Sequence, residues 1–389
     1  MQPLSRRRLK MINKPYLLQK SRIFFLFFGK INLKGSVTLN RTDLQNDFYK
    51  RYNVSRHHLC FSKAGLLCTF LGYENIKNTE FISCALSMCI HIAGRRLDSR
   101  IIRLENTKTG VCTVFRPDDA FDSMQLKDIF EKFCFSALPG AELLYDSTIP
   151  PFFSQRASLR TAFMNTLQKL SDTNSGDFKK TAICAGNGNP SQYSALLAAK
   201  RGWCSYTNGT YTENLPLPLT GYKLLSVQTH AKSNAHHISA VKHAFETIRH
   251  IYPHITSTGD ITADILDSVK KRLSRSEINY MQHLISEHEK IQTAKTALKA
   301  CRLYDFAEIV NASEYSAQQL WNCRREHVFL SDAVNPLSGC LCSRQWKNGI
   351  IAIVDEESID YIINILRHEF CASYGYNPMF CISDTCSTE

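Results

Sequence analysis

Hydrophobic positions in residues 273–321 recur every three or four residues, which is the spacing of one buried helical face. The apolar positions in the first half of this stretch are Ile278, Met281, Leu284, Ile285, Ile291, Ala294 and Leu298. Polar residues, among them Glu277, Gln282 and Glu287, fill the opposite face. A short second helix over about residues 304–310 follows a Cys-Arg turn, so the pattern predicts an antiparallel helical hairpin.

Other parts of the chain alternate between strand and helix patterns, which favours an α+β protein. Helical patterns are found at residues 43–53, 121–135, 158–170, 237–251 and 260–271. Strand patterns are found at residues 66–71, 96–117 and 215–232, the last two as strand pairs joined by Thr-Gly turns. Residues 338–383 predict strand, turn, strand, helix and strand, because Asp355 is a good N-cap and Gly375 suits a helix C-terminus.

The composition is that of a globular protein of about two domains. The chain has 389 residues, of which 44% are hydrophobic and 21% are charged. Its 15 cysteines are irregularly spaced and no signal peptide precedes them, so we interpret them as reduced thiols of a cytoplasmic protein. Cys340 and Cys342 lack a second pair at zinc spacing. Because no carboxylate accompanies His243, His250 and His254 at helical spacing either, no metal site is predicted.

The net charge of +12 suggests a nucleic-acid partner until the charge is located along the chain. Residues 1–42 hold ten lysines and arginines and no acidic residue, so the remaining residues are nearly neutral. Such a tail is compatible with phosphate binding, targeting or translated upstream sequence, and we expect a poorly ordered extension without a nucleic-acid partner. The apolar run at residues 23–28 is too short to span a membrane, and no membrane association is predicted.

The residues of the helical hairpin resemble one protein family. QHLISEHEKI, followed by TALKACRLYDFAEIVNASEYS, is similar to the galactokinases of the GHMP small-molecule kinase superfamily. In that family a histidine, a glutamate four residues later and a basic residue three beyond open this helix, and His283, Glu287 and Lys290 keep that order. Further matches are Ala297, Leu298, Phe306, Ala312, Ser313 and Ser316. The matching residues identify the family but take no part in its reaction.

The resemblance extends to residues 61–86, which overlay the opening signature of galactokinases without gaps. Lys63, Ala64 and Gly72 match that signature. The catalytic arginine of the family falls on Leu67, and its sugar-binding carboxylates fall on Tyr73 and Ile76. Tyr73, Glu74 and Asn78 remain candidates for binding a sugar, because a buried hydroxyl needs a hydrogen-bond partner. The alternative for these residues is a solvated loop.

Residues 147–167 lie where galactokinases place a glycine- and serine-rich loop that leads into a helix and cradles the ATP phosphates. The candidates for nucleotide binding in this stretch are Ser154, Gln155, Arg156 and Ser158. Phe152 and Phe153 replace the glycines, and their rings fill the space that a close approach of backbone to phosphate requires. Arg156 could pair with a phosphate, and the alternative is a simple turn at the start of a helix.

The next family motif carries an aspartate that serves as base or electrostatic anchor for the sugar hydroxyl, and Ser191 occupies that position. A serine has no negative charge and does not act as a base near neutral pH without one beside it. A second glycine-rich loop of the family corresponds to residues 343–349. Here Gln345, Trp346, Lys347 and Asn348 replace most of the glycines.

The resemblance implies a two-domain GHMP-kinase fold with the ligand cleft between the domains. We expect a basic extension at residues 1–42, a shortened N-terminal domain at 43–199 and a C-terminal domain at 200–389. The first functional hypothesis is a non-catalytic, pseudokinase-type protein that binds a hexose or a nucleotide or has a regulatory role. The second is an active kinase that transfers phosphate from ATP to the anomeric hydroxyl of galactose or a related sugar.

The losses at Leu67, at Ser191 and in both glycine-rich loops favour the non-catalytic hypothesis. Each electrostatic contributor to such a reaction is worth roughly 10²–10³ in rate. ATP and Mg²⁺ would be cofactors only of the active kinase, and in the non-catalytic protein we expect weak or absent nucleotide binding.

Overall fold

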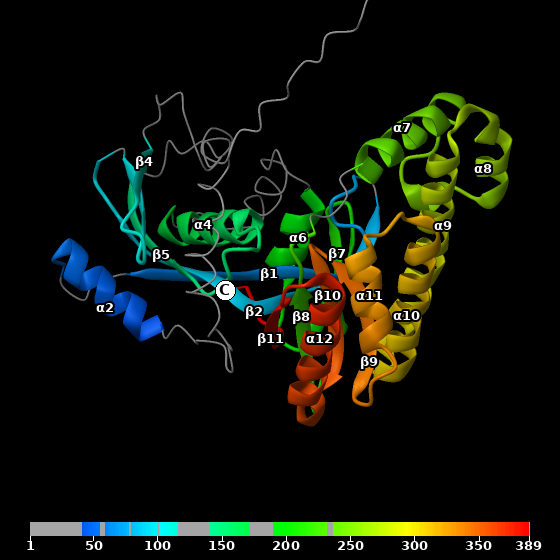
Figure 1. The fold of residues 1–389 in the computed structure, drawn as a ribbon. Coiled ribbons are helices and arrows are strands. Elements are labelled where there is room, and N and C mark those ends of the chain that lie inside the picture. The colour runs from blue at the N-terminus through cyan, green and yellow to red at the C-terminus, as the bar shows by residue number, and fades with distance from the viewer. Residues whose placement is uncertain are drawn as a thin grey trace, which may run out of the picture. The chain divides into compact units, whose positions relative to one another are not determined.

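The computed structural model describes residues 41–54, 59–77, 79–99, 101–115, 140–171, 190–231 and 236–388. These residues contain both helices and strands, and the strands form two separate β-sheets (Figure 1). This arrangement confirms the α+β prediction. No helix among these residues is long and apolar enough to cross a bilayer.

The larger sheet is built around a long antiparallel hairpin of β1 and β2, in which Cys60 pairs with Gly94 and Gly72 with Phe81. Its path is β4-β3-β5-β2-β6-β7, with β1 attached to β2. The strands are β1 (Cys60–Gly72), β2 (Glu80–Arg96), β3 (Ile102–Asn106), β4 (Cys112–Phe115), β5 (Ala141–Ser147), β6 (Trp203–Asn208) and β7 (Tyr211–Pro216). The strands β6 and β7 come after residue 199 in the chain but belong to the larger sheet. The domain boundary at residue 199 stays a prediction.

Three helices pack on the larger sheet. They are α2 (Arg41–Tyr52), α4 (Arg156–Ser171) and α6 (Pro190–Ala198). The helix α4 lies along β1 and β2, and its Phe163 and Leu167 enter the main apolar core with strand residues such as Ile92 (Figure 1). Phe48 on α2 packs in a smaller apolar cluster with Ala93 and Leu144 of the sheet.

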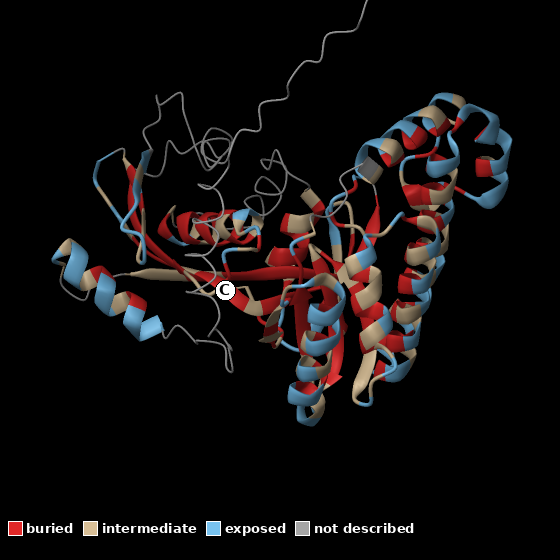
Figure 2. Cartoon of the chain, viewed as in Figure 1, coloured by how far each residue is buried: buried red, intermediate tan, exposed pale blue. Residues whose placement is uncertain are grey.

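The smaller sheet has the order β11-β8-β10-β9 and is covered on both faces. Its strands are β8 (Tyr222–Gln228), β9 (Cys340–Trp346), β10 (Gly349–Asp355) and β11 (Met379–Ser383). Alternate residues of β10 point to opposite faces: Ile350 and Val354 pack with α11 (Arg325–Val334) and α12 (Ile359–Tyr374), while Ile351 and Ile353 enter the main core. Figure 2 shows the buried residues along these strands.

The predicted helical hairpin is present as α9 (Arg275–Lys299) and α10 (Leu303–Leu320). Ser274 caps α9 in a capping box with Glu277. The expected end of the second helix near residue 310 was wrong, because the buried polar residues Ser313 and Glu314 find hydrogen-bond partners and the helix continues. The N-terminal half of α9 packs against α7 (His236–Ile251) and α8 (Ala263–Val269) in a separate apolar core.

Two other expectations about elements differ from the structure. The helix expected at residues 260–271 is shorter, because 3-10 turns at Thr258–Asp260 and Lys270–Arg272 flank α8. The strands β2, β5 and β6 and the helices α6 and α11 were not expected from the sequence. The helix expected at residues 121–135 lies outside the described residues.

Candidate functional site

A buried ion pair joins the two sheets and the helical hairpin. Arg344 on β9 donates from Nη2 to Oε2 of Glu287 on α9 at 3.2 Å, and both side chains are at most 3% exposed. The same Oε2 accepts the backbone N–H of Gly72, at the end of β1, at 2.9 Å. Ser313 on α10 donates to the other oxygen of Glu287 at 2.5 Å and accepts from Arg344. The pair therefore fixes β1, α9, α10 and β9 relative to one another.

The surroundings of Glu287 keep its carboxylate ionised. Burial alone would raise the pKa of Glu287, but the charge of Arg344 and the hydrogen bonds from Ser313 and Gly72 lower it to about 2. Glu287 is therefore ionised near neutral pH and balances the guanidinium charge.

Beside the ion pair, Tyr73, His283 and Ser316 form a hydrogen-bonded row. The Tyr73 hydroxyl lies 2.8 Å from His283 Nε2, and His283 Nδ1 lies 2.8 Å from the Ser316 hydroxyl. The Tyr73 ring stacks on Trp321 with centroids 4.2 Å apart. Burial lowers the pKa of His283 to about 4, so this histidine is neutral near pH 7. Both ends of the imidazole are engaged within the fold.

The predicted sugar-binding residues lie in the turn that follows β1. The Tyr73 hydroxyl is already bonded to His283. Glu74 is 6% exposed, accepts a hydrogen bond from Thr69 at 2.7 Å and pairs with Lys347 Nζ at 3.5 Å. Asn78 lies outside the described residues. The ion pair to Lys347 brings this turn against the turn between β9 and β10.

The predicted nucleotide-binding residues lie at the start of α4. Ser154 and Arg156 are exposed. Gln155 donates to the Ile149 carbonyl at 3.0 Å, and the Ser158 hydroxyl donates to the Gly65 carbonyl of β1 at 2.8 Å. Two of the four residues therefore bond within the protein, and the exposed pair remains available to solvent.

Aromatic rings occupy the region where the resemblance places the two glycine-rich loops. Phe153 is 4% exposed, and its ring lies 5.1 Å from that of Trp346, which is also 4% exposed. Phe152 packs on Phe153 with ring centroids 4.7 Å apart. The structure thus brings the two loop positions together through buried rings, and not through open backbone amides.

The positions of the family's arginine and aspartate lie in neighbouring elements. Leu67 on β1 is 4% exposed and belongs to an apolar cluster with Ala195 and Leu196 of α6. Ser191 is 5% exposed in the first turn of the same helix. The structure therefore brings together the two positions that the resemblance assigns to catalysis, and Leu67 is part of an apolar contact there.

Arg160 on α4 is a buried charge that the sequence analysis did not single out. It is 2% exposed, and its guanidinium lies 5.6 Å from the ring centroid of Tyr193 on α6. Its Nε and Nη2 have no hydrogen-bond partner among the described residues. The signal was present in the sequence, because residue 160 falls on the helical face of Phe163, Met164 and Leu167.

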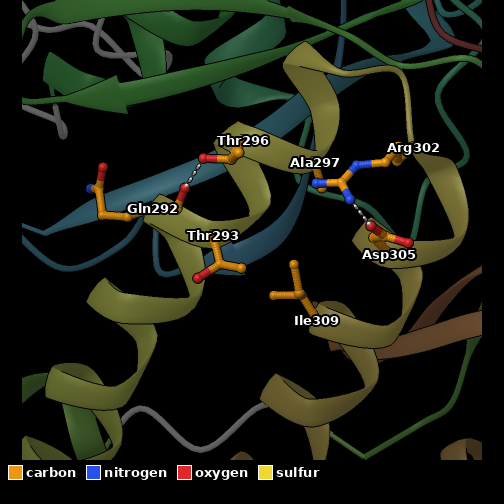
Figure 3. Close-up of a pocket in the computed structure, with 7 residues that line it drawn as sticks. All are labelled: Gln292, Thr293, Thr296, Ala297, Arg302, Asp305 and Ile309. Carbon is orange, nitrogen blue, oxygen red and sulfur yellow. Dashed lines mark hydrogen bonds and ion pairs between the residues drawn. The ribbon is translucent and has the colours of Figure 1, made fainter.

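A groove of about 360 Å³ lies between α9 and α10 (Figure 3). Its lining residues are Gln292, Thr293, Thr296, Ala297, Arg302, Asp305 and Ile309. Arg302 and Asp305 form an ion pair at 2.8 Å, and both are about half exposed. None of the predicted site residues lines this groove, so it is separate from the candidate site.

The fold is similar to those of solved small-molecule kinases. Galactokinase of Lactococcus lactis, solved in complex with galactose, matches with a TM-score of 0.77 at 15% identity over 90% of this chain and 99% of that one. Mevalonate kinase of Methanococcus jannaschii matches with a TM-score of 0.57 at 12% identity over 86% of this chain and 99% of that one. The chain therefore has the fold of the GHMP small-molecule kinases.

Within this class the chain is galactokinase-like, as the sequence motifs indicated. A galactokinase of Halalkalibacterium halodurans is 24% identical over 237 residues. That match covers 56% of this chain and 58% of the other protein, so it spans less than two thirds of the relative's length. No family model matches the chain.

The buried His283 should make stability depend on pH between about 6.5 and 4. Its pKa is about 4 in the folded protein and 6.5 ordinarily, so in this window only the unfolded chain binds the proton. The stabilisation from neutral His283 is complete above pH 6.5 and declines as the pH falls, by up to about 1.4 kcal/mol per pH unit. Urea unfolding across this range measures the slope. It should flatten in His283→Gln and persist in the exposed-site control His254→Gln, and an unchanged slope in His283→Gln would contradict the assignment.

Proposed function

We propose that this chain is a non-catalytic, galactokinase-like protein that binds a galactose-type hexose without phosphoryl transfer. The contact between Phe153 and Trp346 is the observation that carries the proposal. In the resembling kinases a glycine-rich backbone at these positions cradles phosphate. Backbone amides must approach an anion closely to bind it, and two buried rings occupy that space here.

The loss of charge at the catalytic positions supports the same proposal. Phosphoryl transfer depends on positioned charges that stabilise the transferring group and orient the attacking hydroxyl. Leu67 is buried in an apolar cluster and provides no such charge. Ser191 stands at the aspartate position and provides no carboxylate.

The residues present do not fit ATP and Mg²⁺. The hydroxyl of Ser158 and the amide of Gln155 already bond to backbone carbonyls. Serine at position 191 also removes a carboxylate, which is the kind of ligand that Mg²⁺ takes from a protein beside substrate phosphates. We therefore assign no reaction step to a nucleotide.

A solved relative and a pair of charged side chains support a sugar ligand. The Lactococcus lactis galactokinase with this fold was solved with galactose. In this chain Glu74 and Lys347 meet beside the turn after β1, and a carboxylate next to an ammonium suits a ligand with several hydroxyls. The Tyr73 hydroxyl is bonded to His283. A carboxylate can accept further hydrogen bonds beside those from Thr69 and Lys347, so we assign the direct sugar contact to Glu74.

The alternative is an active ATP-dependent sugar kinase. One observation favours it: Arg156 is exposed at the first position of α4, a helix of 16 residues whose N-terminus attracts anions. In that case Arg156 would replace part of the missing phosphate cradle.

We expect the purified chain to show no galactose-dependent ATP turnover. Coupled ADP release with galactose, arabinose and galacturonate in turn measures it. Ser191→Asp alone and Ser191→Asp with Leu67→Arg should also stay near background, because groups that act as a unit recover little when repaired singly. Turnover near ~1 s⁻¹, an ordinary enzyme rate, in the unmodified chain would reject the proposal in favour of the active kinase.

Galactose should raise the melting temperature of the chain by a few degrees, because a ligand that binds only the native state stabilises it. The rise should shrink in Glu74→Gln, which removes the carboxylate charge at nearly constant shape. The matched control is Glu289→Gln, an exposed position on α9, in which the rise should be unchanged. The absence of any rise at high galactose concentration would exclude the sugar ligand.

A further inference from the structure

Two thiols that lie far apart in the sequence meet at strand β2 of the larger sheet. Cys89 belongs to β2, and Cys386 belongs to the C-terminal tail that follows β11. Their sulfur atoms are 3.5 Å apart, and the residues are 3% and 8% exposed. A disulfide bond of ~2.05 Å requires the two sulfurs to approach by about 1.5 Å.

Backbone hydrogen bonds hold the tail in this place. Ser87 N–H donates to the Asp384 carbonyl at 2.7 Å, and Cys386 N–H donates to the Ala85 carbonyl at 2.8 Å. Further along, the Thr388 N–H donates to the Ala199 carbonyl, just beyond α6, at 3.2 Å. The tail thus continues beside β2, and the position of Cys386 is set by main-chain contacts on both sides of it.

The larger sheet leaves room for the Cys386 thiol. A side chain at Gly65 on β1 would place its Cβ only 2.5 Å from the Cys386 sulfur. The Leu86 carbonyl lies 3.1 Å from the Cys386 sulfur and 3.7 Å from the Cys89 sulfur. The two thiols therefore share one small site between β1 and β2.

The surroundings of Cys89 favour its thiolate form, which is the reactive form of cysteine. The hydrogen bond with Cys386 lowers the pKa of Cys89 to about 6, against the effect of burial and with help from His91. Lys63 pairs with His91 across β1, and Asp146 pairs with it across β5. Among the described residues, the thiol of Cys84 on β2 also acts on Cys386 and favours its neutral form.

We propose that Cys89 and Cys386 form a reversible disulfide under peroxide stress, and that this bond fastens the C-terminal tail to β2. The Cys89 thiolate attacks one oxygen of hydrogen peroxide, the O–O bond breaks, and the departing hydroxide takes up a proton to become water. Cys89 becomes a sulfenic acid. Cys386 then attacks its sulfur, the S–S bond forms, and a second water leaves with the Cys386 proton. Two thiols are oxidised and one peroxide is reduced.

A second buried pair shows why the reaction should be selective. Cys68 and Cys84 are direct cross-strand partners on β1 and β2. Burial raises the pKa of Cys68 well above its ordinary value, so it remains a thiol and reacts slowly. The Cys89–Cys386 bond should therefore form first.

The test treats the full-length, reduced chain with hydrogen peroxide, blocks the remaining thiols and maps the peptides by mass spectrometry. The expected result is one cross-link between the Cys89 and Cys386 peptides, a loss of two hydrogen atoms in intact mass, and reversal by dithiothreitol. Because the bond closes a long loop, the oxidised chain should also melt a few degrees higher. The rate of bond formation should rise as the pH passes through about 6 and level off above it, once Cys89 is fully a thiolate.

Variants separate this bond from general oxidation. Cys386→Ser should abolish the cross-link and the peroxide-dependent rise in melting temperature. Cys381→Ser, a buried thiol in β11 five positions earlier, should leave both unchanged. If either cysteine variant fails to fold, the peptide map of the unmodified chain still decides. A map with cross-links only between other cysteines, or with Cys89 and Cys386 both reduced, would overturn the proposal.

Discussion

The buried ion pair between Glu287 and Arg344 is the interaction on which the rest of the structure depends. Both side chains are almost inaccessible to water, and removing one partner of such a pair typically costs about 3–5 kcal/mol, because an unpaired charge stays behind. Glu287 also holds the Gly72 amide, so the pair sets where β1 ends and where the turn with Glu74 begins. The family pattern on α9 is thus explained by structure and not by catalysis.

The residues that hold the fold together are separate from the positions that the resemblance assigns to chemistry, so under the proposed function the fold persists without phosphoryl transfer. The ion pair and its partner Ser313 lie on α9, α10 and β9. On the same β9, Trp346 packs against Phe153, and on the same β1, Leu67 belongs to an apolar cluster. Both side chains add buried apolar contacts, which stabilise a fold. Under the proposed function they stand where an active kinase would need amides and charges.

The sequence predicted the local features well, because they follow from short-range patterns. The α9–α10 hairpin follows from helical periodicity. Asp355 caps the 3-10 turn that leads into α12, and Gly375 ends α12. The partners of Glu287 could not be predicted, since Arg344 approaches it only through the packing of β9 on the hairpin. Likewise, the replacement of glycine by Phe153 was visible in the sequence, but its contact with Trp346 depends on how two distant turns pack.

Isothermal titration calorimetry of Mg-ATP into the unmodified chain tests the central claim most directly, because that claim concerns the space in which phosphate would bind. With Phe153 and Trp346 in contact, the account predicts no binding in the micromolar range. Arg156→Met provides the control, since Arg156 is the exposed cation at the start of α4. A micromolar dissociation constant for Mg-ATP that is weakened by Arg156→Met would contradict the account and show a working nucleotide site.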